Sequence, residues 1–160
     1  MALPPPVADF LRPGARIAVA GVSRNPNQPA NAIFRKLRAA GHEVIPVNPN
    51  AAQLEGAICY PNLESIPGAI DGVVVVTHPN AAVAVVREYA STRPGDPVKR
   101  IWFHRSIGDG SVSQQAIDEC KARNIDSVIV GGCPMMYCEP VDVAHRCMRS
   151  VLRIFGRVPG

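Results

Sequence analysis

The sequence predicts an α/β fold of Rossmann type, a doubly wound parallel sheet of about five strands in a three-layer α/β/α arrangement. Two patterns predict this fold class. Short apolar runs, each followed directly by a glycine or a polar residue, alternate along the chain with segments of helical periodicity. Strands that alternate with helices of this length form parallel sheets with right-handed crossovers. The length of 160 residues and the 47% share of hydrophobic residues suit one globular domain.

The elements follow in chain order from these patterns. Residues 1–15 hold three consecutive prolines and a short apolar stretch, which predicts an N-terminal arm or lead-in helix that covers the sheet. An unbroken valine run is typical of a strand buried on both faces, and a glycine after a run of apolar helical spacing marks a helix end. The strands are expected at 16–20, 43–47, 71–76, 99–103 and 127–130. The helices are expected at 30–40, 79–90, 112–123 and 141–154. One Rossmann-like domain therefore spans residues 16–155.

Charge and composition narrow the class of partner. The net charge is +4, which phosphate ligands or a solvated surface would explain equally well. The basic residues are dispersed, so no nucleic acid partner is expected. No apolar stretch reaches the ~18 residues of a membrane helix, and the N-terminus lacks the pattern of a secretory signal, so no membrane partner is expected. The five cysteines do not have the spacing of a disulfide framework, which favours a cytoplasmic protein.

The candidate binding residues are sought in the loops that follow the strands. In an open parallel sheet, ligands bind beyond the carboxyl ends of the strands, where the strand order reverses. Four segments fall there, at 21–28, 48–50, 77–80 and 104–110, and each carries glycine or short polar residues.

The loop after the first strand has the residues of an anion site. Gly21 permits a tight turn, Ser23 offers a hydroxyl and Arg24 offers a guanidinium, next to the N–H groups of the helix that follows. An ordinary strand-to-helix turn would explain the same residues equally well. The loop lacks the G-x-G-x-x-G fingerprint of dinucleotide sites, and Asn48 stands where an acidic residue would hold a ribose. NAD is therefore disfavoured as the ligand.

Four segments, in this order, resemble the CoA-binding protein family. They are IAVAGVSRNP (17–26), GHEVIPVNP (41–49), LEGAICYPNLESIP (54–67) and DGVVVVTHP (71–79). The family consists of small, free-standing Rossmann domains similar to the N-terminal domain of the succinyl-CoA synthetase alpha subunit. The later segments WFHRSIGDGSVS and GGCPMMYCEPVD resemble one branch of the family, whereas another branch has a glutamine in place of His104.

The resemblance implies coenzyme A as the ligand. The first loop would hold its pyrophosphate, the turn after the second strand would flank its adenosine, and the loop after the third strand would line the path of the pantetheine arm toward residues 102–107. The implied binding residues are, in that order, Gly21, Val22, Ser23 and Arg24; Val47, Asn48 and Pro49; Thr77, His78 and Pro79; and His104. Arg35 or Lys36 is suggested as a second cation for the phosphates.

We therefore expect a non-enzymatic protein that binds CoA or acyl-CoA. No paired carboxylates and no Ser/His/Asp order indicate a catalytic residue, and His78 and His104 are expected to face a ligand rather than to catalyse. The synthetase alpha subunit transfers phosphate through a histidine of a second domain, for which this chain is too short. Two alternatives stay open: an NAD(P)-dependent oxidoreductase, and the CoA-binding subunit of a split acyl-CoA synthetase.

The C-terminal region is rich in cysteine and methionine. Cys133, Cys138, His145 and Cys147 do not have a standard zinc spacing, so packing is their expected role and no metal is expected. Because Cys133 follows the fifth strand, it is also a candidate for a mixed disulfide with the CoA thiol. The apolar segment 141–158 would cover its own sheet or pair with a second copy in a homodimer.

Overall fold

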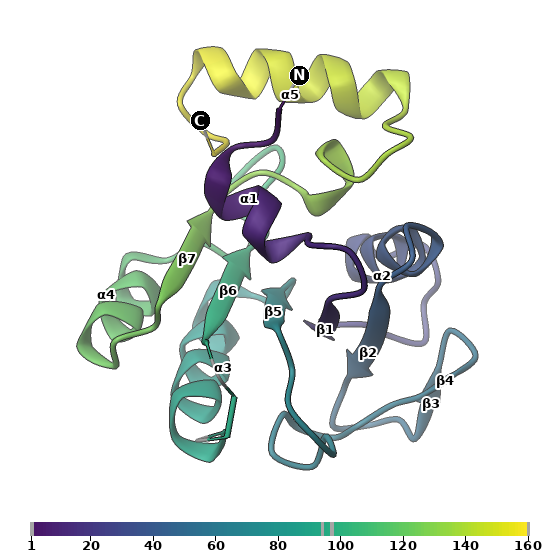
Figure 1. Cartoon of the computed structure of the whole chain (residues 1–160), viewed down its shortest axis with the longest axis vertical. Coiled ribbons are helices and arrows are strands. Elements are labelled where there is room, and N and C mark those ends of the chain that lie inside the picture. The colour runs from purple at the N-terminus through teal and green to yellow at the C-terminus, as the bar shows by residue number, and fades with distance from the viewer. Residues whose placement is uncertain (1, 94, 97, 160) are drawn as a thin grey trace.

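The computed structural model describes residues 2–93, 95, 96 and 98–159, and its centre is a parallel sheet with helices on both sides (Figure 1). Each strand pairs in parallel with its neighbours in the sheet. In the order in which they lie side by side, the strands are β2 (Glu43–Val47), β1 (Arg16–Ala20), β5 (Gly72–Val75), β6 (Arg100–Phe103) and β7 (Ser127–Val130). The predicted fold class, a doubly wound parallel sheet of five strands, is confirmed.

Helices bury both faces of the sheet. Against one face lie α1 (Pro5–Phe10), α2 (Pro29–Ala39), η1 (Pro134–Met136) and α5 (Val143–Ile154), and against the other lie α3 (Pro79–Thr92) and α4 (Gln114–Ala122). Trp102 of β6 is buried on the face of the sheet that α1 and α2 cover. Its ring contacts Phe10 of α1 edge to face, with the ring centroids 5.5 Å apart. Its Nε1 donates to the carbonyl of Gly131 at 2.9 Å. Among the described residues, no helix is both long and apolar enough to cross a membrane.

Several boundaries differ from the expectation by one or two residues, and one hairpin was not expected. The last two helices begin two residues later than expected, because side-chain caps fix their starts. Ser113 and Asp142 accept N–H groups from the first turns of α4 and α5, at 3.1 and 2.9 Å. The hairpin of β3 (Gln53–Leu54) and β4 (Ala57–Ile58) was not predicted, because strands of two residues are too short to show a period.

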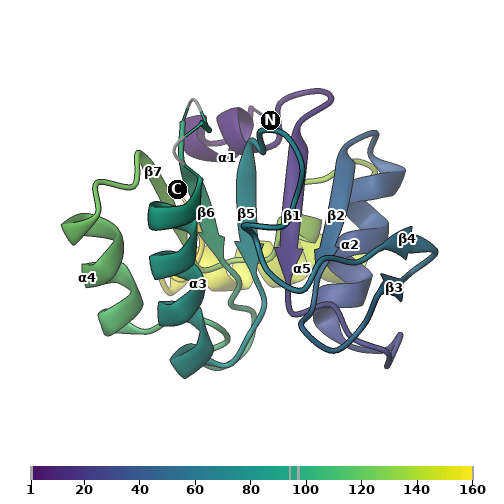
Figure 2. The ribbon, with the colours of Figure 1, turned by 90° about the horizontal axis from the view of Figure 1, so that it is seen from below.

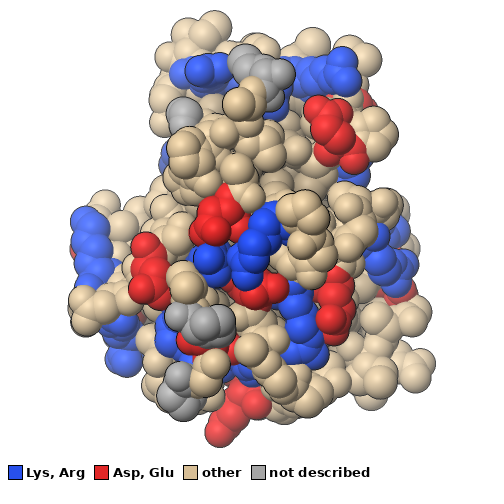
Figure 3. Space-filling model, viewed as in Figure 1, with Lys and Arg blue, Asp and Glu red and all other residues tan. Residues whose placement is uncertain are grey.

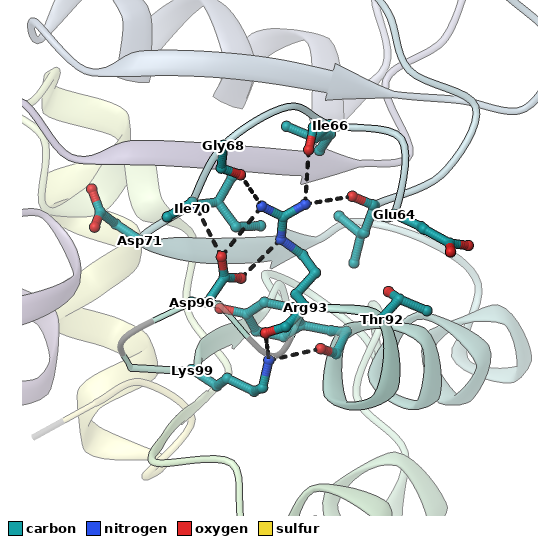
Figure 4. Close-up of polar contacts among 12 residues, drawn as sticks. Glu64, Ile66, Gly68, Ile70, Asp71, Thr92, Arg93, Asp96 and Lys99 are labelled. Carbon is teal, nitrogen blue, oxygen red and sulfur yellow. Dashed lines mark hydrogen bonds and ion pairs between the residues drawn. The ribbon is translucent and has the colours of Figure 1, made fainter.

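A buried ion pair fixes the segment that leads into β5 (Figure 4). Arg93 follows α3, and its Nε donates to Asp96 at 2.8 Å while both side chains are almost fully buried. The same guanidinium donates to the carbonyls of Leu63 and Ile66 at 2.8 and 3.0 Å. Asp96 in turn accepts the N–H of Ile70 at 3.1 Å. A buried charge is stable only when an opposite charge and hydrogen-bonding groups surround it. The loop before β5 supplies these groups to the ion pair, so the pair fixes the position of this loop.

On the face shown in Figure 3, the charged side chains are mixed in sign, with Lys and Arg interspersed with Asp and Glu. Pairs such as Arg16–Glu43 at 2.7 Å and Arg100–Asp9 at 2.5 Å link strand starts to neighbouring elements. The basic residues of these pairs therefore contribute to local contacts rather than to one positive field.

Candidate functional site

The strand order reverses between β1 and β5, which lie side by side in the sheet. From β1 the chain passes through α2 to β2, and it then returns past β1 to β5, whose helix α3 covers the opposite face (Figure 2). The loops that leave β1 and β5 therefore diverge, which opens a crevice at the carboxyl ends of these strands.

Gly21 brings the ends of β1 and β5 close together. Its φ of 111° lies in the region that favours glycine. A Cβ atom at this position would overlap the carbonyl oxygen of Val76, at the end of β5. The N–H of Gly21 donates to the carbonyl of Val47 at 3.3 Å, which links the same turn to β2. The close approach of the strand ends at the crevice therefore depends on this glycine.

Side chains hold the loop that follows β1. Asn31, buried in α2, accepts the N–H of Ser23 at 3.0 Å and donates to the carbonyl of Ser23 at 2.8 Å. The hydroxyl of Ser23 accepts the N–H of Asn25 at 3.1 Å. Val22 is fully buried in the core. The loop is therefore preorganised, but the N–H and the hydroxyl of Ser23 already have partners within the protein.

Asn48 and Arg24 join this loop to the turn after β2. The Nδ2 of Asn48 donates to the carbonyl of Val22 at 2.8 Å, and its Oδ1 accepts the N–H of Asn50 at 2.7 Å. Arg24 is exposed and donates to the carbonyl of Asn50 at 2.6 Å. Pro49 is exposed at the same turn. The structure thus brings the predicted residues of the two loops together, and it assigns the amide of Asn48 to shaping the turn.

Arg35 and Lys36, suggested as a second cation, have partners within the protein. Arg35 pairs with Glu55 at 2.7 Å, and Lys36 donates to the carbonyl of Pro140 at 2.5 Å. Both side chains therefore stabilise contacts between segments of the chain.

A cavity of about 300 Å³ occupies the crevice. Of the predicted residues, Gly21, Thr77 and His104 line it. The predicted residues outside its lining are Val22, Ser23, Arg24, Val47, Asn48, Pro49, His78 and Pro79. Gln28, Ser106, Ile107 and Gly110 also line the cavity, and they fall within the loop segments 21–28 and 104–110 in which the sequence places the binding residues. The lining outside the predicted segments comes from the end of β5, the first turn of α2 and the end of the loop after β6, and it consists of Pro29, Ala30, Val76 and Ser111.

Part of this lining left a signal in the sequence. Pro29 occupies the first position of α2, where proline is favoured, and it lies one residue before the predicted helix start. At Gly110, a Cβ atom would overlap the carbonyl oxygen of His104, which explains the glycine. Ser111 is buried and donates from its hydroxyl to the carbonyl of Thr77 at 2.6 Å. Because this hydrogen bond joins two residues far apart in the sequence, no local pattern predicts the position of Ser111.

The two histidines of the binding loops lie in different environments. His78 is exposed and caps α3, where its Nδ1 accepts the N–H of Asn80 at 3.5 Å and Pro79 is the first helical residue. His104 is 7% exposed, and burial lowers its pKa to about 4. The ring of His104 is therefore neutral near pH 7, which makes it a hydrogen-bonding group and not a cation.

The thiol of Cys133 does not have the properties of a nucleophile. It is 4% exposed, and burial raises its pKa to about 12. Because the thiolate is the reactive form, the structure argues against Cys133 as a candidate for a mixed disulfide with CoA. Burial also raises the pKa of Cys138, to about 11, whereas Cys147 is exposed on α5.

Doubly wound sheets bind their ligands in the crevice at the switch point, so the fold and the cavity place this protein among the Rossmann-type domains. The comparison with known families is more specific. The family described as CoA binding domain matches residues 15–139, and the chain belongs to this family. The family predicted from the sequence motifs is thereby confirmed, and membership supports CoA binding in general.

The chain is also similar to a curated protein and to solved structures. The uncharacterized protein YneT of Bacillus subtilis (strain 168) is 31% identical over 86 residues, which are 54% of this chain and 64% of that protein, less than two thirds of its length. A conserved hypothetical protein from Pyrococcus furiosus is 29% identical with a TM-score of 0.62, over 71% of this chain and 91% of that one. The dinucleotide forming acetyl-coenzyme A synthetase 1 of Ca. Korarchaeum cryptofilum is 22% identical with a TM-score of 0.61. That match covers 78% of this chain and 27% of the synthetase and shows a shared fold.

Proposed function

We propose that this protein binds coenzyme A, free or acylated, in the crevice between β1 and β5, without catalysing a reaction of its own. One observation carries the proposal: in a CoA binding domain, the β1 turn, the N-terminus of α2 and the β6 loop surround one cavity. Its volume of about 300 Å³ falls within the range of ligand sites. All five cysteines are free thiols, so we place the protein in the cytoplasm.

The proposed position of CoA in the crevice is based on the groups that can bind an anion and on the loops at the strand ends. The pyrophosphate lies against the turn at Gly21 and the N-terminus of α2, where the helix dipole favours an anion. A guanidinium has five N–H donors, so Arg24 can bind a phosphate while it holds the carbonyl of Asn50. The adenosine then flanks the turn after β2, and the pantetheine arm passes the loop after β5 toward His104.

The two alternatives differ in their support. In dinucleotide domains an acidic side chain after the second strand binds a ribose hydroxyl. Asn48 stands there instead, and both ends of its amide bind backbone groups of this chain, which disfavours an NAD(P)-dependent oxidoreductase. A CoA-binding subunit of a split acyl-CoA synthetase is compatible with the fold match to part of a synthetase, and co-purification of a partner subunit would favour it.

We also propose that the outer face of α5 pairs with a second copy of the chain. Val143, Val151 and Ile154 lie on that face and are 75%, 52% and 82% exposed. In an antiparallel pair, Asp142 at the start of one α5 would lie near Arg157 beyond the end of the other. Burial of the apolar residues and this charge complementarity both favour a homodimer.

Isothermal titration calorimetry with CoA, dephospho-CoA, NADH and NADPH tests the proposed function. We expect CoA to bind and Arg24→Ala to weaken it about 10- to 150-fold, the size of a charge-assisted hydrogen bond. Arg38→Ala removes an exposed arginine of α2 outside the cavity lining, and it should change the affinity by less than about twofold. Binding of NADH without CoA would refute the proposal, as would unchanged CoA affinity after combined replacement of Ser23 and Arg24 by alanine.

A further inference from the structure

A second cavity, of about 200 Å³, lies next to the crevice. Pro29, His104 and Ser106 line both cavities, so the two spaces meet at a common wall. The other walls of the second cavity come from α2, from the segment around η1 and from α5. In the proposed pose the pantetheine arm ends at His104, which would place the CoA thiol next to the second cavity.

The lining of the second cavity is mainly hydrocarbon and sulfur. Ile33 is fully buried, and Met135 and Met148 extend the apolar wall from two different segments. Cys133, kept protonated by burial, adds a group without charge. Methionine side chains adapt to groups of different shape. A lining of this composition favours a carbon chain over a phosphate or another ion, because an ion would lose its hydration without compensation.

The polar side chains of this lining are few. His104 presents a neutral ring, and Ser106 offers a hydroxyl. His145 also lines the cavity, and its Nδ1 is engaged by Asp142 at 2.6 Å, so Nε2 is the nitrogen left for a ligand. A few polar groups in an apolar cavity are typical of a site that orients one polar atom of an otherwise apolar group. A thioester with its carbonyl oxygen and short alkyl chain has this character.

We infer that the second cavity holds the acyl group of a short-chain acyl-CoA. The inference rests on the proposed function, because an acyl group reaches this cavity only when CoA lies in the crevice. At about 30 Å³ for each water-sized group, a volume of about 200 Å³ has room for about six non-hydrogen atoms, which suits a butyryl group. Each buried methylene is expected to raise the affinity about fourfold until the cavity is full.

Titration of the protein with CoA, acetyl-CoA, butyryl-CoA and octanoyl-CoA tests the inference. We expect butyryl-CoA to bind about 15-fold more tightly than acetyl-CoA, from two added methylenes at about fourfold each, and octanoyl-CoA to bind no more tightly than butyryl-CoA. Equal affinities for CoA and butyryl-CoA would overturn the inference and leave the proposed function standing. Binding of neither ligand would overturn both.

Two variants change the size of the cavity in opposite directions. Ala32→Leu fills it and should reduce the affinity for butyryl-CoA to that for CoA, while the affinity for CoA changes by less than about twofold. Ala39→Leu, on an exposed position of the same helix, is the matched control and should change neither affinity. Met148→Ala enlarges the cavity and should move the preference toward octanoyl-CoA. An Ala32→Leu protein that loses CoA and butyryl-CoA alike, or an unchanged chain-length preference in Met148→Ala, would refute an acyl site here.

Discussion

Replacement of Gly21 by alanine tests how the crevice is built. The structure predicts two costs. A side chain at a φ of 111° strains the backbone, by about 1–2 kcal/mol for left-handed conformations. The added methyl group would also overlap the carbonyl oxygen of Val76, so β1 or β5 must move, and overpacking of this kind costs about 1–3 kcal/mol. The free energy of unfolding should therefore fall by about 2–5 kcal/mol, and the melting temperature by about 6–15 °C.

Gly14→Ala is the matched control for this experiment. Gly14 has a φ of 71°, but nothing lies within 4 Å of a Cβ atom at this position, so only the backbone cost of about 1–2 kcal/mol is expected. Thermal and urea unfolding of both variants, followed by CoA titration, separates the two costs. We expect Gly21→Ala to be the less stable protein and to lose CoA affinity that Gly14→Ala retains. Equal stability and equal CoA affinity of the two variants would refute the reasoning.

Two further predictions concern His104 and α5. Burial lowers the pKa of His104 to about 4 in the folded protein, whereas the unfolded chain protonates this residue below about pH 6.5. The unfolded state therefore binds more protons between these values, and stability should decrease by up to about 3 kcal/mol as the pH falls from about 6.5 to about 4. Urea unfolding should show a smaller decrease for His104→Gln, and identical pH profiles would contradict this account. For α5, we expect Ile154→Glu to convert a dimer to a monomer in analytical ultracentrifugation, whereas Ile58→Glu, which changes an exposed residue of β4, leaves the dimer intact. A wild-type protein that sediments as a monomer would refute the pairing.

The layers of the fold could be predicted because burial on both faces of a parallel sheet leaves a local pattern. β5 carries consecutive valines with no exposed side, and the prediction places this strand within one residue of its observed ends. The loop between β4 and β5 left no such pattern. Its position depends on Arg93, whose partners Leu63 and Ile66 lie far away in the chain. A single sequence does not distinguish a buried arginine from an exposed one. The contacts of Arg93 with this loop could therefore not be predicted.

The candidate site also contains residues that a local pattern predicts and residues that depend on long-range contacts. Gly21, Thr77 and His104 follow strands directly, so an ordinary rule about strand ends finds them. The rest of the cavity lining depends on where a helix begins and on how the loop after β6 folds back. Ser111 belongs to the second group, since its bond to Thr77 joins residues 34 positions apart. The sequence therefore identified the family, the edge of the sheet and the loops at that edge, but not the walls formed by the start of α2 and by Ser111.

The two ends of the proposed CoA site differ in rigidity, and the difference has a functional consequence. At the nucleotide end, the side-chain amides of Asn31 and Asn48 link the loops after β1 and β2 to each other and to α2 through hydrogen bonds to backbone groups. Such preorganisation favours one invariant ligand group, because little ordering entropy is lost on binding. At the thiol end, Met135 and Met148 form walls that adapt to different shapes. A site of this construction would recognise the part that all acyl-CoA molecules share and tolerate variation in the acyl group, within the limit of a cavity of about 200 Å³.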